Sequence, residues 1–153
     1  MGKIYIATSG CGKTYFCKHN LNWIDLDYYL FDTAIKNEAA FLKFFGFYNF
    51  WDYNIFTNNP KAINWLQQWN VKIDAYILPT ADMKSEMIER LRDRKDKEDK
   101  SGSYFEEFSK KFDAELAIIK RLDCPKIYLK PGQYITDVLD SAGNIKPGVK
   151  VIK

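Results

Sequence analysis

The stretch that most constrains this chain is Lys3 to Tyr15, in which a short apolar run leads into a glycine-rich turn. The run Ile4-Tyr5-Ile6 is typical of a buried β-strand, and A-T-S-G-C-G-K-T follows at residues 7–14. These eight residues match the phosphate-binding pattern G-x-x-x-x-G-K-[ST], with Ala7 in place of the first glycine. The match predicts a strand, a loop that cradles phosphate, and a helix that begins at Lys13.

Each residue type in this loop has a physical reason. Gly10 and Gly12 permit backbone angles that turn successive N–H groups toward a phosphate, and the following helix N-terminus adds partial positive charge. Lys13 would reach the β- and γ-phosphates, and Thr14 would place its hydroxyl on Mg²⁺. We therefore predict a nucleoside triphosphate ligand. The predicted nucleotide-binding residues are Ser9, Gly10, Cys11, Gly12, Lys13, Thr14 and Tyr15.

Two carboxylates follow the next apolar run, Trp23 to Leu26, which we predict to be a second strand. Asp25 and Asp27 are two residues apart, so in an extended chain their side chains lie on the same side. Acidic residues at the end of a strand beside a phosphate loop hold Mg²⁺-bound water or a substrate hydroxyl. We predict that Asp25 contacts the metal together with Thr14. The alternative is that the two aspartates cap the next helix and contact solvent.

Residues 28–52 contain ten aromatic side chains, and we predict that this segment binds the acceptor substrate. Aromatic rings can stack on a nucleobase. The alternative for any single ring is a place in the hydrophobic core.

A highly charged hairpin at about residues 84–104 is predicted to form a lid. Arg90 and Arg94 are four residues apart and share a helix face. Arginines on a mobile cover can close over a transferring phosphoryl group and stabilise its charge. The alternative is a solvated helix end with weak ion pairs.

The 153 residues have the length of a single domain, which we predict to span residues 1–153. Strand and helix patterns alternate, which predicts an α/β fold with a five-stranded parallel sheet and helices on both faces. The predicted strands are 4–6, 23–26, 53–57, 71–79 and 126–129, and the predicted helices are 13–19, 34–45, 60–69, a long helix from 80, 105–122 and 134–139.

Composition narrows the class of protein. The net charge of +3 is too small to indicate a nucleic-acid-binding surface, so a nucleic-acid partner is not expected. Cys11, Cys17 and Cys124 form no disulfide framework, and Cys11 lies within the phosphate loop. We therefore expect a reducing, cytoplasmic environment. No apolar run is long enough to span a membrane. The sequence leaves open whether the chain forms a homodimer.

These motifs together resemble the P-loop nucleoside and nucleoside monophosphate kinases, in particular the (deoxy)nucleotide kinases of bacteriophages. The resemblance rests on residues 7–14, D-L-D at 25–27, Y-I-L-P at 76–79, E-R-L-R-D-R at 89–94 and the stretch 105–113. It covers the chain to about Leu139 and implies a three-layer P-loop kinase fold with a helical lid. It also implies that Lys13, Thr14 and the loop backbone bind ATP and Mg²⁺.

The resemblance further implies that Asp25 or Asp27 serves the metal or the acceptor, and that Arg90 and Arg94 come down from the lid. The chain departs from the family at three places. Ala7 replaces a glycine, the third predicted strand ends in Thr57-Asn58 with no aspartate, and Lys95 stands where a glycine often follows the lid arginine.

Three functions stay open at this point. The first is phosphoryl transfer from ATP to a (deoxy)nucleoside monophosphate, whose acceptor oxygen needs no general base. The second is transfer to a hydroxyl of a nucleoside, a sugar or a polynucleotide 5′ end, with Asp25 or Asp27 as the base. The third is a nucleotide-binding switch or interaction module, for which the missing aspartate after the third strand is unfavourable.

Overall fold

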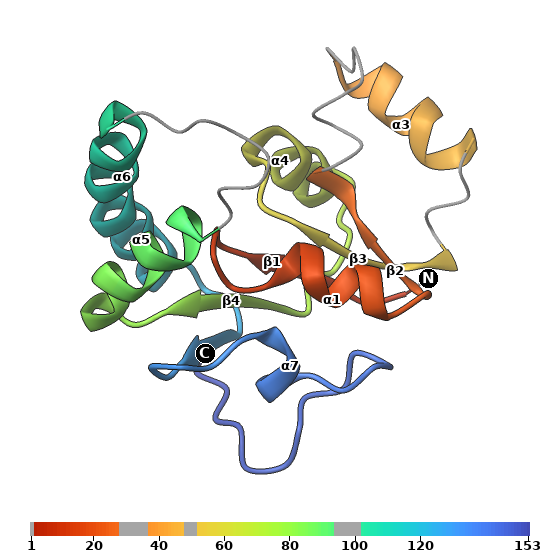
Figure 1. Ribbon diagram of the computed structural model, residues 1–153. Coiled ribbons are helices and arrows are strands. Elements are labelled where there is room, and N and C mark those ends of the chain that lie inside the picture. The colour runs from red at the N-terminus through yellow and green to blue at the C-terminus, as the bar shows by residue number, and fades with distance from the viewer. Residues whose placement is uncertain (1, 28–36, 48–51, 94–101) are drawn as a thin grey trace.

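The computed structural model describes residues 2–27, 37–47, 52–93 and 102–153, and within these ranges the chain forms a five-stranded sheet flanked by helices (Figure 1). The strands are β1 (Ile4–Ala7), β2 (Trp23–Asp25), β3 (Asn54–Thr57), β4 (Ala75–Pro79) and β5 (Lys126–Leu129). Their order is β2-β3-β1-β4-β5, and every pair of neighbours is parallel. The predicted α/β class and five-stranded parallel sheet are confirmed.

Helices cover both faces of this sheet, as the alternation of side chains along β1 makes clear. Ile4 packs in one cluster with α3 (Glu38–Phe47) and α4 (Pro60–Gln68), and Ile6 packs with α6 (Gly102–Arg121). Tyr5 and Ala7 point the other way, toward α1 (Lys13–His19) and α7 (Ile135–Val138). Figure 1 shows α3, α4 and α6 above the sheet and α7 below it. The result is a three-layer arrangement with β1 at its centre.

Element boundaries follow local chemistry. The Asn59 side chain accepts hydrogen bonds from the Lys61 and Ala62 N–H groups, so it caps α4 just before Pro60. Asn70, expected to stop that helix, takes a left-handed conformation with φ 57°.

Other boundaries differ from the prediction. Gly46 was expected to end α3, but the helix includes it and runs to Phe47. Strand β4 begins at Ala75 rather than Val71, and Asp74 just before it accepts a hydrogen bond from the Ile4 N–H.

The charged region after β4 begins with a 3₁₀ turn at Ala81–Met83 rather than with α-helix. This turn leads into α5 (Lys84–Arg92), the first part of the predicted lid. Residues 94–101 lie outside the described residues, and α6 starts at Gly102.

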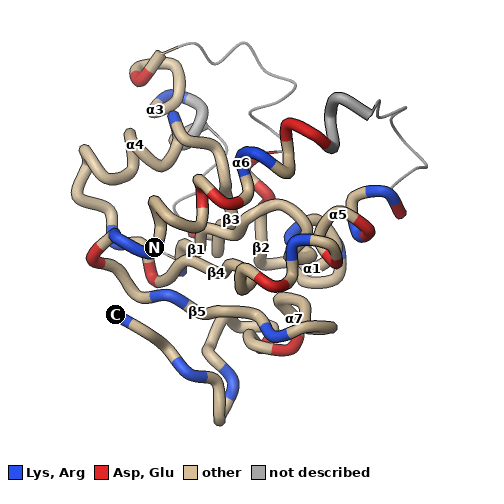
Figure 2. Tube along the Cα trace, turned by 90° about the vertical axis from the view of Figure 1, so that its left-hand side faces the viewer, with Lys and Arg blue, Asp and Glu red and all other residues tan. Residues whose placement is uncertain are grey.

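The segment after α7 returns to the sheet edge. Lys126 of β5 exchanges two backbone hydrogen bonds with Ile152, in an antiparallel bridge rather than a sixth strand. Figure 2 shows lysines along this segment, and residues 145–153 contain no acidic residue. The segment lies on the opposite side of the sheet from α3 and α4 (Figures 1 and 2). Its positive charge is therefore separated from those two helices.

Candidate nucleotide-binding site

The loop between β1 and α1 has the backbone that the phosphate-binding pattern predicts. Gly10 and Gly12 have φ angles of 91° and 96°, which residues with a Cβ rarely adopt. A Cβ on Gly12 would also lie 3.1 Å from the Tyr134 ring. Helix α1 begins at Lys13, directly behind this turn. The loop therefore ends at a helix N-terminus, which favours bound anions.

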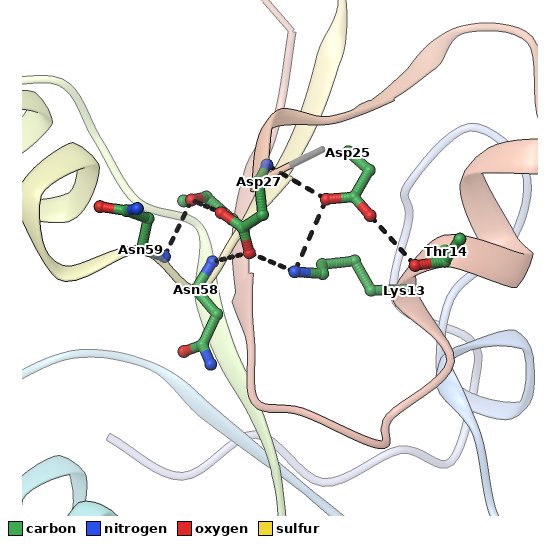
Figure 3. A network of polar contacts seen from close by, with 7 residues as sticks. Lys13, Thr14, Asp25, Asp27, Asn58 and Asn59 are labelled. Carbon is green, nitrogen blue, oxygen red and sulfur yellow. Dashed lines mark hydrogen bonds and ion pairs between the residues drawn. The ribbon is translucent and has the colours of Figure 1, made fainter. Parts of the chain in front are cut away.

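Lys13 is held between the two predicted carboxylates (Figure 3). Its Nζ donates a hydrogen bond to Asp27 Oδ2 and lies 3.6 Å from Asp25 Oδ1. The ammonium group is largely buried, with 15% of the side chain exposed. An ion pair that is mostly shielded from solvent is screened less by salt than a surface pair. The network thus fixes a positive charge at the carboxyl end of the sheet, beside the loop.

Asp27 connects this charge to the neighbouring strand. Thr57 at the end of β3 donates its hydroxyl hydrogen to Asp27 Oδ1 at 2.5 Å, and the Asn58 N–H donates to Oδ2 at 2.7 Å. The sequence has no aspartate after β3, and the Asp27 carboxylate comes into contact with that strand end from β2. With Lys13 included, Asp27 accepts from three donors, so both of its oxygens are engaged.

Asp25 lies nearer to the start of α1. The Thr14 hydroxyl donates to Asp25 Oδ2 at 3.2 Å, which brings together the two predicted metal-contacting residues. Among the described residues, no group of three or more His, Cys, Asp or Glu side chains could hold a metal ion. Mg²⁺ commonly takes only one or two protein carboxylates, with water and phosphate oxygens as its other ligands. The Thr14 hydroxyl and Asp25 carboxylate fit that mode of binding.

Arg90 contacts the loop from α5. One guanidinium nitrogen donates to the Gly10 carbonyl at 2.9 Å, and another donates to the Gln133 carbonyl at 2.7 Å. The guanidinium also pairs with Glu86 and lies 3.8 Å from the centre of the Tyr134 ring. Arg90 therefore joins the phosphate loop to the segment between β5 and α7.

A cavity of about 430 Å³ opens beside these groups, and we call it the Arg90 cavity. Gly12, Thr14 and Tyr15 line it from the loop and α1, and Tyr134 lines it opposite. The Tyr15 side chain is 61% exposed. The cavity therefore combines the start of a helix, a cation, one carboxylate (Asp93) and two aromatic rings. The helix start and the rings suit a nucleotide.

Cys11 lies beneath the loop rather than at its surface. Burial raises the pKa of its thiol to about 11, and the sulfur lies 3.4 Å from the Thr8 hydroxyl. A thiol that stays protonated at neutral pH is a weak nucleophile. The side chain of Cys11 thus supports the loop, and only its backbone can face a ligand.

The structure places the remaining predicted residues as follows. Ser9 is exposed and lines a second cavity, between α4 and α6. Arg94 lies outside the described residues, as do residues 28–36 and 48–51 of the predicted acceptor segment. Phe41 of that segment is fully buried and stacks on Trp69, so this ring belongs to the core.

Sequence reasoning missed three contributors to the site. Tyr134, Glu86 and Thr57 each contact a predicted residue, but none belongs to the loop motif. Glu86 could have been found from its spacing of four residues before Arg90, since such pairs share a helix face. Tyr134 gave no comparable signal, because its place depends on where α7 packs.

A scan against protein-family models found no match for this chain, and a search of the curated proteins found none either. Across the described ranges, none of the helices is both long enough and apolar enough to cross a membrane.

Proposed function

We propose that this chain is an ATP-dependent phosphotransferase whose acceptor is a (deoxy)nucleoside monophosphate. The observation that carries the proposal is the position of Lys13, which stands at the end of the glycine turn with its ammonium group between Asp25 and Asp27. A lysine held in this place can exchange a carboxylate for phosphate oxygens of a bound nucleotide. The family resemblance of residues 7–14 points to the same chemistry.

The chain's own groups can share the work of the transfer. The loop N–H groups and the start of α1 would bind the donor phosphates, and Lys13 would offset charge that develops on the transferring group. Thr14 and Asp25 would hold Mg²⁺, which on binding neutralises negative charge on the phosphate oxygens. The Arg90 cavity would take the remainder of ATP, with Tyr15 and Tyr134 as its aromatic contacts.

The occupancy of Asp27 favours a monophosphate acceptor over a hydroxyl acceptor. A general base needs a carboxylate oxygen that can approach the hydroxyl. Both oxygens of Asp27 already accept hydrogen bonds from the end of β3, one from the Thr57 hydroxyl and one from the Asn58 N–H. A phosphate acceptor is already ionised and requires placement and positive charge instead of a base.

The test is a panel assay that measures ADP release from ATP and Mg²⁺ with each nucleoside monophosphate, each nucleoside and a 5′-hydroxyl oligonucleotide. Turnover that depends on a monophosphate is the expected result. Turnover with a nucleoside or oligonucleotide alone would establish the hydroxyl-acceptor reaction instead. ATP binding with no acceptor-dependent turnover would indicate a nucleotide-binding module.

A further inference from the structure

A second cavity of about 700 Å³ lies on the other side of the phosphate loop, between α4 and α6, and we call it the α4–α6 cavity. Ile6 of β1 and Tyr76 of β4 line it from the sheet. Its volume falls within the range of about 300–1,000 Å³ that is usual for small-molecule sites. The walls include Ile63, Asn64, Gln67, Phe108, Phe112 and Glu115.

The α4–α6 cavity lies next to the residues that hold Lys13. Ser9 of the loop and Asn58 after β3 both line it. The backbone N–H of Asn58 donates to Asp27, and Asp27 accepts from Lys13. A molecule in this cavity would therefore have one end next to the group that binds the transferring phosphate.

Glu115 is the unusual member of the cavity wall. It is partly buried on α6, its carboxylate oxygens reach solvent, and within the described ranges no side chain or backbone group donates to it or forms an ion pair with it. Burial raises the pKa of its carboxyl group, because the ionised form loses hydration. A carboxylate in a largely apolar cavity gains from a ligand that donates hydrogen bonds. Of the described lining residues, only Lys111 offers an opposite charge.

We propose that the α4–α6 cavity holds the nucleobase of the acceptor, and that Glu115 selects bases with an exocyclic amino group. The inference rests on the proposed function, since it assigns the acceptor's place in that reaction. Phe108 and Phe112 supply apolar contact for a flat ring. The charges of Lys111 and Glu115 offset each other, which suits the uncharged base of the acceptor rather than its phosphate. Carboxylates accept hydrogen bonds from amino groups such as that of cytosine. Thymine and uracil would instead place carbonyl oxygens near Glu115.

Binding can be tested without catalysis. The wild-type protein, with its isoleucine methyl groups labelled, is titrated with cytidine, adenosine, guanosine and thymidine monophosphates and followed by NMR. Shifts at Ile63 and Ile119, with weaker binding of the thymine nucleotide, are expected. Shifts confined to Ile135 on α7, or equal affinity for thymine, would overturn the proposal, whether or not the protein proves to be a kinase.

Kinetics supply the residue-level test. In the ADP-release assay, Glu115→Gln should raise the acceptor KM for amino-bearing bases by about tenfold or more and leave the KM for ATP unchanged. Because glutamine can both donate and accept, the variant should also narrow or reverse the preference against thymine. Glu107→Gln, an exposed position on the same helix, is the matched control.

A variant that fills the α4–α6 cavity tests the role of the cavity independently of Glu115. Ile63→Trp should fill the α4–α6 cavity and abolish acceptor-dependent turnover, with ATP affinity retained as proof of folding. If Glu115→Gln and Ile63→Trp both keep the wild-type acceptor KM, the cavity assignment fails while the phosphotransferase proposal stands. If labelled Ile63 reports base binding but no acceptor supports ADP release, the cavity assignment stands while the phosphotransferase proposal fails.

Discussion

The two cavities beside the phosphate loop differ in how their charged groups are paired. In the Arg90 cavity, the guanidinium of Arg90 is satisfied by Glu86 and by the carbonyls of Gly10 and Gln133. In the α4–α6 cavity, the Glu115 carboxylate accepts no hydrogen bond from any residue that the structure describes. A group that the protein already pairs holds a site in shape before a ligand arrives, whereas a group in contact with water alone is available to a ligand. Arg90 thus belongs to the first kind and Glu115 to the second, which is what the proposed selection of the base requires.

Removal of Lys13 should have the largest effect on activity, because Lys13 is the cation that Asp25 and Asp27 hold beside the phosphate loop. We expect Lys13→Ala to lower kcat by at least about 100-fold, by analogy with the loss of a group that stabilises transition-state charge. The free energy of unfolding should also fall, because the change leaves the Asp25 and Asp27 carboxylates, which are only 12% and 25% exposed, without their cation. ADP release measures the first effect and urea unfolding the second. Lys18→Ala, on the exposed face of the same helix, is the control; retained activity in Lys13→Ala would remove the basis for linking the two cavities.

Arg90→Ala tests whether the first cavity is held rigid by its own contacts. Only 8% of the Arg90 side chain is exposed, and its loss leaves the Gly10 and Gln133 carbonyls without this donor, whereas Glu86 keeps the hydrogen bond from the Gly132 N–H. We expect a loss of about 2–3 kcal/mol in the free energy of unfolding, the range for hydrogen bonds to charged groups. Urea titration measures it, beside Arg92→Ala at an exposed position of the same helix. Equal stability of the two variants would contradict the assigned role of Arg90.

Asp27→Asn tests whether Asp27 acts through Mg²⁺ or as a general base. Asparagine retains an acceptor for Thr57 or Asn58 but loses the charge that holds Lys13. For a monophosphate acceptor we expect a loss in kcat of about tenfold, comparable to one hydrogen bond to a charged group, with partial recovery at high Mg²⁺. ADP release across a Mg²⁺ titration measures it. A loss that Mg²⁺ leaves unchanged would count against a metal role and favour the hydroxyl-acceptor reaction.

The first of the two cavities was largely predictable from sequence, because its loop is local. The turn at Gly10 and Gly12 and the start of α1 at Lys13 depend on consecutive residues, so a short pattern specified them. Asp25 and Asp27 were also found, since a parallel sheet brings strand ends to one edge. The contact of Asp27 with Thr57 was not predicted, because it requires β3 to lie between β2 and β1 in the sheet.

Almost nothing in the sequence indicates the second cavity. Glu115 was one acidic residue in a charged amphipathic helix, and such residues are usually solvated. Its burial follows from the separation of α4 and α6, which depends on the packing of both helices on Ile6 and Tyr76. Phe108 and Phe112 lie at helical spacing and pack in the core, and that spacing does not indicate that they also border an open volume.

The smallest expected effect concerns the pH dependence of stability. It tests whether the folded protein disfavours the ionised form of Glu115. Burial raises the pKa of this carboxyl in the native state above its ordinary value of 4.5. Below pH 4.5 both native and unfolded states are protonated and carry no penalty; as pH rises through the raised native pKa, the native state becomes relatively less stable. Glu115→Gln should therefore be more stable than wild type at pH 7, and the difference should disappear near pH 4. Urea midpoints at the two pH values measure this, with Glu107→Gln as the control for the change in net charge. A constant difference at both pH values would mean that the Glu115 carboxylate is already satisfied, and the contrast between the two cavities would be lost.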